Sequence, residues 1–163
     1  MFSVELLHEL LDYNPETGIF TWKVCRRGRT SPGKVAGCVN GRGYITLGVC
    51  GSQYPAHRVA WFYMHGTWPD GEVDHINGIK TDNRMCNLRV ATRIENSRNV
   101  GITSKNKTGV KNVYWHSGHK RYRACIDVDR KEVHLGYFKN LSDAEAVVAE
   151  ARVKYHGDFA CHK

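Results

Sequence analysis

One aspartate, one histidine and two asparagines within residues 73–99 carry side chains that could bind a metal ion and move a proton. Asp74 and His75 stand together after a short apolar stretch, Asn87 follows a polar loop, and Asn96 lies further on. A carboxylate and an amide carbonyl favour a hard cation such as Mg²⁺ or Mn²⁺, whose other ligands are water and substrate phosphate. An imidazole can take a proton from an attacking water near neutral pH. Together these groups could hydrolyse a phosphate ester.

The surrounding sequence predicts a strand, a loop, a second strand and a helix that position these groups. Residues 73–76 and 88–90 have the apolar, β-branched content of two short strands, and N-G begins the polar loop between them. Thr92 and Glu95 have the spacing of a capping box, which predicts the start of a helix. Because such a helix packs across the hairpin, its asparagine can approach the aspartate of the first strand.

The same residues are also compatible with a purely structural role. An isolated Asp-His pair is most often structural or solvent-exposed, and neighbouring strand residues point to opposite sides of the backbone. The loop after the pair has an ordinary turn composition. A calcium loop does not fit, because the spacing of Asp74, Asn77, Asp82 and Asn83 departs from D-x-[DN]-x-[DN]-G and the final glutamate is missing.

The distribution of charge indicates an anionic partner. The 163 residues carry a net charge of +8, and residues 101–141 hold nine Lys and Arg against three Asp and Glu. A basic segment with interspersed aromatic residues is typical of nucleic-acid binding, although a basic face that only maintains solubility is an alternative. The Gly-rich, basic residues 26–43 are predicted as a loop or hairpin tip near a nucleic-acid backbone.

Cysteine usage and hydropathy indicate a cytoplasmic protein. The six cysteines include no C-x-x-C pair, which argues against a zinc ribbon and a dense disulfide framework and favours free thiols. The N-terminus has no basic-then-apolar signal, and no apolar run approaches the roughly 20 residues of a membrane span.

Hydrophobic patterns predict the remaining elements. Before residue 73 they indicate a helix capped by Ser3 that includes Leu11, a strand over IFTWKV, a hairpin around C-G-S, and a helix ended by Gly66. After a linker, three strands and one helix follow, with Trp115 predicted to point inward. Two features are predicted for the last helix: a capping box of Ser142 and Glu145, and an apolar stripe of Ala144, Val147, Val148, Ala151 and Tyr155.

The stretch VDHINGIKTDNRMCNLRVATRIENSRN closely resembles the ββα-metal motif of HNH endonucleases, in the phage and intron-encoded subgroup whose final histidine is replaced by asparagine. AHRVAWFYMHG is similar to that subgroup's lead-in. The resemblance implies Asp74 and Asn96 as metal ligands and His75 as the general base. It implies that Asn87 orders the loop and helps to orient His75. The final asparagine favours magnesium or manganese over zinc or nickel.

Residues 109–160 resemble the Apetala or ethylene-response-factor type of DNA-binding domain through GVKNVYW, RYRACI, HLGYF and SDAEAVVAEARVKYHG. Members of that family lay a three-stranded sheet in the major groove of double-stranded DNA. Several Arg and Trp positions of the plant proteins differ here, so the resemblance implies phosphate affinity rather than a sequence preference. The implied DNA-binding residues are Lys111, Tyr114, His116, Arg121, Arg123 and His134.

The combined prediction is an α+β protein with a ββα-metal (HNH) module in residues 1–99, its core at about 72–99, and a linker at 100–108. A three-stranded antiparallel sheet packed on one helix follows in residues 109–163. The predicted function is that of a DNA endonuclease using one Mg²⁺ or Mn²⁺ per active site and no small-molecule cofactor. It would act on double-stranded DNA in a bacterial host cell, encoded by a phage or mobile element, as a monomer or homodimer. Two alternatives are a non-catalytic DNA-binding regulator and an RNA-binding or RNA-processing protein.

Overall fold

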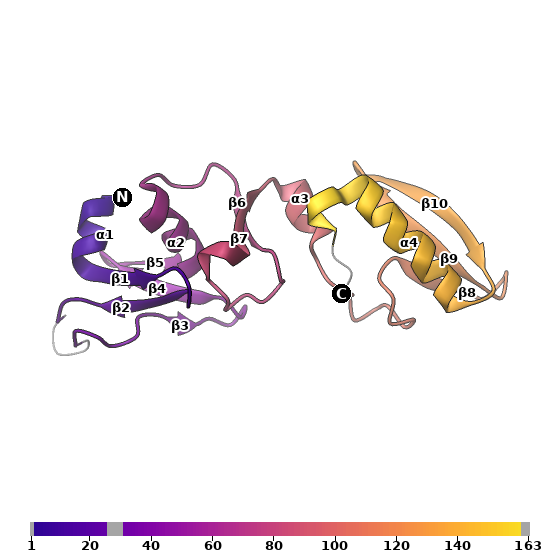
Figure 1. Cartoon of the computed structure of the whole chain (residues 1–163). Helices are drawn as coiled ribbons and strands as arrows, with labels where there is room; N and C mark the ends of the chain where they lie inside the picture. The colour runs from indigo at the N-terminus through magenta and orange to yellow at the C-terminus, as the bar shows by residue number, and fades with distance from the viewer. Residues whose placement is uncertain (1, 26–30, 161–163) are drawn as a thin grey trace. The chain divides into compact units, whose positions relative to one another are not determined.

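The computed structural model describes residues 2–25 and 31–160 (Figure 1). Cys161 and residues 26–30 of the Gly-rich basic segment lie outside the described residues. The chain divides between Thr92 and Arg93 into two compact units. In the described residues, no helix combines the length and the apolar character that crossing a membrane requires. The predicted module bounds, residues 1–99 and 109–163 with a linker at 100–108, stay a prediction.

The described residues of the N-terminal unit form two α-helices and three small antiparallel sheets, ordered β1-β2, β3-β4-β5 and β6-β7. Their bounds are α1 (Val4–Leu10), β1 (Leu11–Asn14), β2 (Ile19–Trp22), β3 (Cys38–Val39), β4 (Ile45–Val49), β5 (Ser52–Pro55), α2 (Ala56–His65), β6 (Glu72–His75), the 3₁₀ helix η1 (Met85–Asn87) and β7 (Leu88–Ala91). Both helices and all three sheets contribute to one core, whose fully buried members include Leu7, Leu11, Leu47, Val49 and Val59.

Most of the local signals in this unit are confirmed. The hydroxyl of Ser3 accepts a hydrogen bond from the backbone N–H of Leu6 at 3.3 Å and caps α1. Gly66 ends α2 with φ 71°, a left-handed conformation that glycine adopts without strain. The first helix ends at Leu10, however, and Leu11 starts a strand that the sequence did not indicate. Leu11 is fully buried where β1 pairs with β2, so packing across that hairpin overrides the helical pattern.

The hairpin β6–β7 carries Asp74 and His75, as predicted. Asp74 lies opposite Arg89, and His75 lies opposite Leu88. The loop between the strands contains residues 76–84 and then η1. His75 is the last residue of β6, so its side chain lies where the strand passes into the loop.

The C-terminal unit is a three-stranded antiparallel sheet packed on α4, which confirms the α+β prediction. Its elements are α3 (Arg93–Arg98), β8 (Val113–His116), β9 (Arg121–Val128), β10 (Lys131–Phe138), α4 (Leu141–His156) and the 3₁₀ helix η2 (Gly157–Phe159), with strand order β10-β9-β8. Val113 and Ala124 from the sheet pack with Ala144 and Val148 from α4 in a buried core.

Two predictions for α4 are wrong. The helix starts at Leu141 after Asn140, so Ser142 lies inside its first turn and no Ser142–Glu145 capping box forms. The side chain of Asn140 instead donates to the carboxylate of Asp143 at 3.1 Å. Tyr155, expected in the apolar stripe, is exposed, and the buried positions at that end of α4 are Arg152 and His156.

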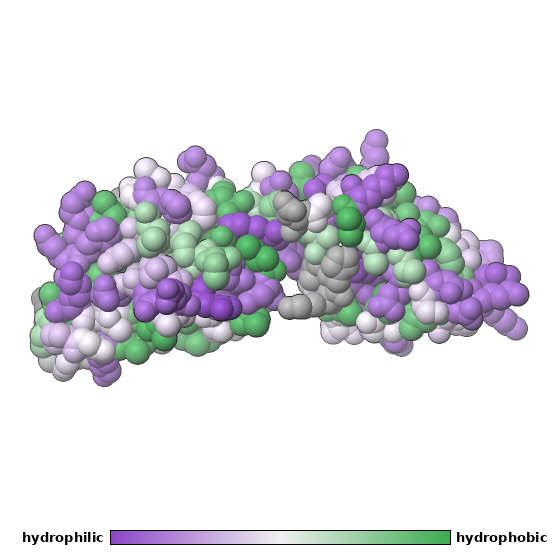
Figure 2. Space-filling model, in the orientation of Figure 1, coloured by the Kyte–Doolittle hydropathy of each residue, from purple (hydrophilic) through white to green (hydrophobic). Residues whose placement is uncertain are grey.

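Trp115 is also more exposed than predicted. It lies on the same side of β8 as the core residue Val113, as the alternation indicates, but 53% of its surface is exposed. β8 is an edge strand, so Trp115 packs on Tyr122 of β9, with ring centroids 5.0 Å apart, and no strand among the described residues lies on its other side. Hydrophobic residues are interspersed with hydrophilic ones on the face of the molecule in view (Figure 2).

Candidate functional site

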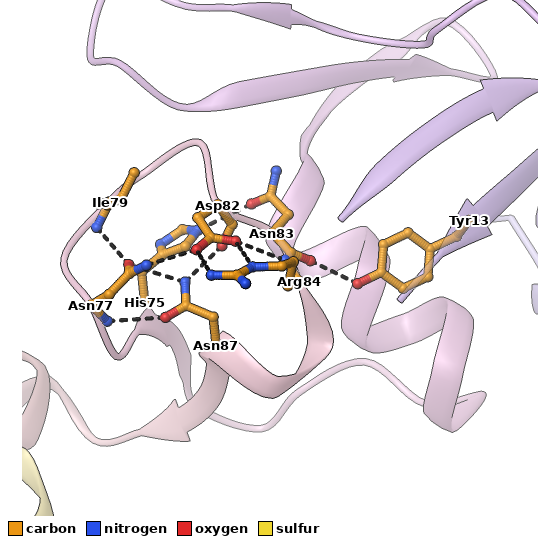
Figure 3. Close-up of polar contacts among 8 residues, drawn as sticks. All are labelled: Tyr13, His75, Asn77, Ile79, Asp82, Asn83, Arg84 and Asn87. Carbon is orange, nitrogen blue, oxygen red and sulfur yellow. Dashed lines mark hydrogen bonds and ion pairs between the residues drawn. The ribbon is translucent and has the colours of Figure 1, made fainter. Parts of the chain in front are cut away.

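His75 is buried and held through one ring nitrogen. Only 4% of its surface is exposed. Its Nε2 lies 3.0 Å from the amide oxygen Oδ1 of Asn83, in the loop that follows β6 (Figure 3). Asn83 is itself almost completely buried. The sequence did not single out Asn83 for this contact, because its D-N-R surroundings look like an ordinary polar turn.

Asn87 closes the loop through both ends of its amide. Its Oδ1 accepts from the backbone N–H of Asn77 at 3.0 Å, and its Nδ2 donates to Asn77 Oδ1 at 3.1 Å and to the carbonyl of Asp82 at 2.7 Å. Its own carbonyl accepts from the N–H of Ile76 at 2.9 Å. The side chain of Asn87 therefore bonds to the backbone of the loop, whereas the side chain of Asn83 contacts the imidazole of His75.

A carboxylate network stiffens the same loop (Figure 3). Asp82 accepts from the side chain of Asn77 at 2.7 Å and from two nitrogens of Arg84 at 2.8 and 2.6 Å. The pKa of Asp82 lies well below its usual range, mainly because the side chain of Arg84 donates hydrogen bonds to its carboxylate. Asp82 therefore stays an acceptor for Asn77 throughout the neutral range.

Asp74 is a buried carboxylate paired with a cation. It is 7% exposed, and Arg89 of β7 donates to its Oδ2 from Nε at 3.0 Å and from Nη2 at 2.9 Å. A buried charge requires such a partner, because desolvation alone would cost several kcal/mol. Asp74 thus contacts β7, whereas its neighbour His75 contacts the loop, as expected for successive residues of a strand.

The second predicted metal ligand, Asn96, lies on α3 in the C-terminal unit, so its approach to Asp74 stays a prediction. In the described part of the chain, no three His, Cys, Asp or Glu side chains are grouped as a metal site. A carboxylate and an amide oxygen would suit Mg²⁺ or Mn²⁺, which keep several waters and bind substrate oxygens. They would not suit a structural zinc site, which is closed by four nitrogen or sulfur ligands.

Two further rings lie beside His75. The ring of His57, from α2, meets the His75 ring at a centroid distance of 4.9 Å and an angle of 70°, and the Tyr44 ring lies 6.1 Å from His75. Burial is the main reason that the pKa of His57 is lowered to about 4, and the neighbouring His75 lowers it further. His57 is therefore neutral near pH 7. His57 lies in the stretch A-H-R-V-A-W, but the sequence did not predict its contact with His75 because the two residues are far apart along the chain.

Acid is expected to destabilise the N-terminal unit through His57. The unfolded imidazole binds a proton near pH 6.5, whereas the folded one does so only near pH 4, so the free energy of unfolding falls as the pH drops between these values. We expect a loss of about 2 kcal/mol between about pH 7 and about pH 5, measured by urea unfolding. His57→Asn should remove this loss, whereas the same change at the exposed His65 should keep it. An unchanged pH dependence in His57→Asn would contradict the assignment.

Five of the six predicted DNA-binding residues lie on one face of the C-terminal sheet. Tyr114 pairs with Arg123 and His116 pairs with Arg121, and paired residues share a face. His134 pairs with Cys125, two residues after Arg123. This face is opposite to the one that packs on α4, since Val113 and Ala124 occupy the alternate positions. We name it the sheet face and define it by Tyr114, His116, Arg121, Arg123 and His134.

The sixth residue, Lys111, lies elsewhere, and a tyrosine was missed. Lys111 precedes β8 and its Nζ donates to the carbonyl of Arg98 at 2.8 Å. Tyr137 of β10 pairs with Arg123, and its ring lies 4.7 Å from the His134 ring and 5.5 Å from the His116 ring. The alternation of β10 shifts at the bulge between His134 and Gly136, which is why a period of two did not place Tyr137 on the sheet face.

Comparison with known proteins identifies the region that contains this site. Residues 54–98 match the family model of an HNH endonuclease. Protein 3.8 of Escherichia phage T7 is 30% identical over 105 residues, which cover 64% of this chain and 86% of that protein. No solved structure matches. No comparison supports the resemblance of residues 109–160 to an Apetala or ethylene-response-factor domain. The chain therefore belongs to the family of phage T7 protein 3.8, and its residues 54–98 form an HNH endonuclease domain.

Proposed function

We propose that this chain is a divalent-metal-dependent endonuclease that hydrolyses phosphodiester bonds of double-stranded DNA. The observation that carries the proposal is the buried imidazole of His75 at the end of β6, adjacent to the buried carboxylate of Asp74 and fixed by a loop that Asn87 closes. A purely structural hairpin needs neither a buried carboxylate nor a buried imidazole, because both groups cost desolvation energy.

His75 is the general base in this proposal. It takes a proton from a water molecule, the resulting oxygen attacks the phosphorus, and the bond from phosphorus to the leaving oxygen breaks. Asp74 and Asn96 are the groups that would hold the Mg²⁺ or Mn²⁺ ion. A divalent ion supplies stabilisation of the charge that develops on the phosphate and leaving oxygens. Arg89 donates two hydrogen bonds to Asp74 Oδ2, so the carboxylate is held in position before any ligand binds.

The sheet face supports a second role, affinity for the DNA backbone. It combines two guanidinium groups with two imidazoles and a tyrosine hydroxyl, all of which can donate hydrogen bonds to phosphate. Arg123 also pairs with Glu132 of β10, which holds its side chain along the sheet. In the strand register, the residue opposite Arg121 is His116 rather than a carboxylate.

Removing the charge of Arg121 is expected to weaken DNA binding without changing its sequence dependence. We expect Arg121→Gln to raise the dissociation constant severalfold and to lower the slope of log K against log salt by about 1, as for the loss of one phosphate contact. Lys154→Gln, which removes a positive charge from the exposed side of α4, is the matched control and should change the slope much less. Equal effects of the two substitutions, measured by fluorescence anisotropy across salt concentrations, would contradict a role for the sheet face.

The proposed activity is tested with supercoiled plasmid DNA. The full chain should convert it to nicked circles before linear DNA in Mg²⁺ or Mn²⁺, because each chain carries one such site, and should leave it intact in EDTA. DNA that is bound but never cut with either ion would contradict the nuclease proposal and favour a regulator. Cleavage of RNA in strong preference to DNA, with matched sequences in the same buffer, would contradict the proposed substrate.

A further inference from the structure

The geometry points to Asn83 as a positioning residue that fixes the proton-bearing nitrogen of His75, and to the β1–β2 hairpin as the element that fixes Asn83. The contact is short and shielded from water, since Asn83 is 1% exposed and lies 3.0 Å from His75 Nε2. The inference deepens the proposed function and rests on it, because a fixed tautomer matters for catalysis only if His75 is the base.

The chemistry of the contact determines the tautomer. An amide oxygen can only accept a hydrogen bond, so the nitrogen opposite Asn83 Oδ1 must carry a hydrogen. A neutral imidazole has one N–H, and with it on Nε2 the lone pair is on Nδ1. Nδ1 is therefore the nitrogen of His75 that can remove a proton from water.

The first hairpin of the chain anchors both sides of Asn83. The hydroxyl of Tyr13, on β1, donates to the carbonyl of Asn83 at 2.7 Å (Figure 3). Two residues further along, the N–H of Met85 donates to the carbonyl of Pro15 at 3.0 Å. Burial raises the pKa of Tyr13 to about 12, so its hydroxyl remains a donor near neutral pH.

Gly18 makes this approach possible. It lies at the end of the β1–β2 turn with φ 73°, and a Cβ atom there would come within 2.5 Å of the backbone of Asn83 and Arg84. Backbone atoms cannot move away as a flexible side chain can, so only glycine allows the turn and the loop to touch. Tyr13, Pro15 and Gly18 all lie before residues 54–98, the part that matches the HNH family model. The hairpin thus acts on the active site from outside the matched region.

The rings beside His75 limit its rotation. The ring of His57 approaches the His75 ring edge-on at a centroid distance of 4.9 Å. The ring of Tyr44 packs in turn against His57, with ring centroids 5.3 Å apart. A half-turn of the imidazole would have to displace these neighbouring rings. Asn83 therefore selects the tautomer, while packing keeps the ring in one orientation.

The test combines a spectroscopic and a kinetic measurement on the full chain. Nitrogen-15 NMR of the histidine side chains, with the His75 signals identified by their loss in His75→Gln, should show the proton on Nε2. Asn83→Leu, which keeps the size but removes the acceptor, should lose this fixed tautomer and lower kcat at least tenfold, with KM changed by less than about twofold. Asn83→Asp, which keeps an acceptor oxygen, should preserve the tautomer and hold kcat within about threefold. Gln53→Leu, an exposed amide-to-leucine change on β5, is the control and should leave both readouts unchanged.

Two results would overturn the inference. One is a wild-type His75 with its proton on Nδ1, which would mean that the Asn83 amide presents its NH₂ group to the ring; the other is an Asn83→Leu variant that keeps both the Nε2 proton and kcat. The wild-type spectrum decides the tautomer even if Asn83→Leu does not fold. If the wild-type protein cuts no DNA, the proposed function fails, while the spectrum still decides whether Asn83 fixes the ring.

Discussion

Replacing His75 by alanine is expected to lower the rate of DNA cleavage by about 10²–10⁴-fold, the usual contribution of a general base. DNA affinity should change little, because the ring is 4% exposed and contributes almost no surface to a bound duplex. The rate is measured on supercoiled plasmid in Mg²⁺, and affinity by anisotropy in EDTA. Added imidazole should restore part of the rate, since it can enter the space left by the side chain and accept the proton.

The same substitution at His65, an exposed histidine on α2, is the control and should leave cleavage within about twofold of wild type. Thermal unfolding of each variant shows whether a loss of rate reflects a loss of folded protein. Cleavage by a folded His75→Ala at the wild-type rate would contradict the assignment of the base.

The second large effect is expected at Asp74. Asp74→Asn keeps the shape of the side chain but removes the charge, so we expect cleavage in Mg²⁺ to fall by about 10²–10³-fold and the half-saturating Mg²⁺ concentration to rise. The guanidinium of Arg89, which is partly buried, then lies beside a neutral amide, 2.9–3.0 Å from the atom that was a carboxylate oxygen. A loss of about 1–3 kcal/mol in the free energy of unfolding should accompany the loss of activity.

A second substitution separates these two losses. Adding Arg89→Gln to Asp74→Asn replaces the ion pair by two amides and should recover most of the stability while cleavage remains lost. Asp70→Asn, at an exposed position before β6, should affect neither measurement. Magnesium-dependent cleavage that is unchanged in a folded Asp74→Asn would contradict the role of Asp74 as a metal ligand.

The strand-loop-strand arrangement of the site could be predicted because its signals are local. Short apolar runs separated by N-G and a polar loop are sufficient to place β6 and β7, and Asp74 and His75 lie where the pattern indicates. The three strands and the helix of the C-terminal unit are equally clear from alternation and from helical spacing. Each of these signals lies within one short segment of the chain.

The contacts that fix His75 could not be predicted because they join distant parts of the chain. Tyr13 and Asn83 are separated by 70 residues, and neither belongs to a pattern that indicates the other. His57 reaches His75 from a helix whose periodicity indicates only that it is buried. The exposure of Trp115 follows from the position of β8 at the edge of the sheet, which depends on strand order rather than on alternation.

Single-turnover cleavage tests the central claim, that His75 acts as the base on DNA bound to this chain, most directly. Wild-type protein and His75→Ala, each in excess over end-labelled DNA and bound in EDTA, are mixed with an excess of Mg²⁺. We expect wild-type protein to cut the bound DNA in one exponential phase and His75→Ala to leave it uncut over the same period. Equal rates for the two proteins, or no cleavage by wild-type protein of DNA that it demonstrably binds, would contradict the account.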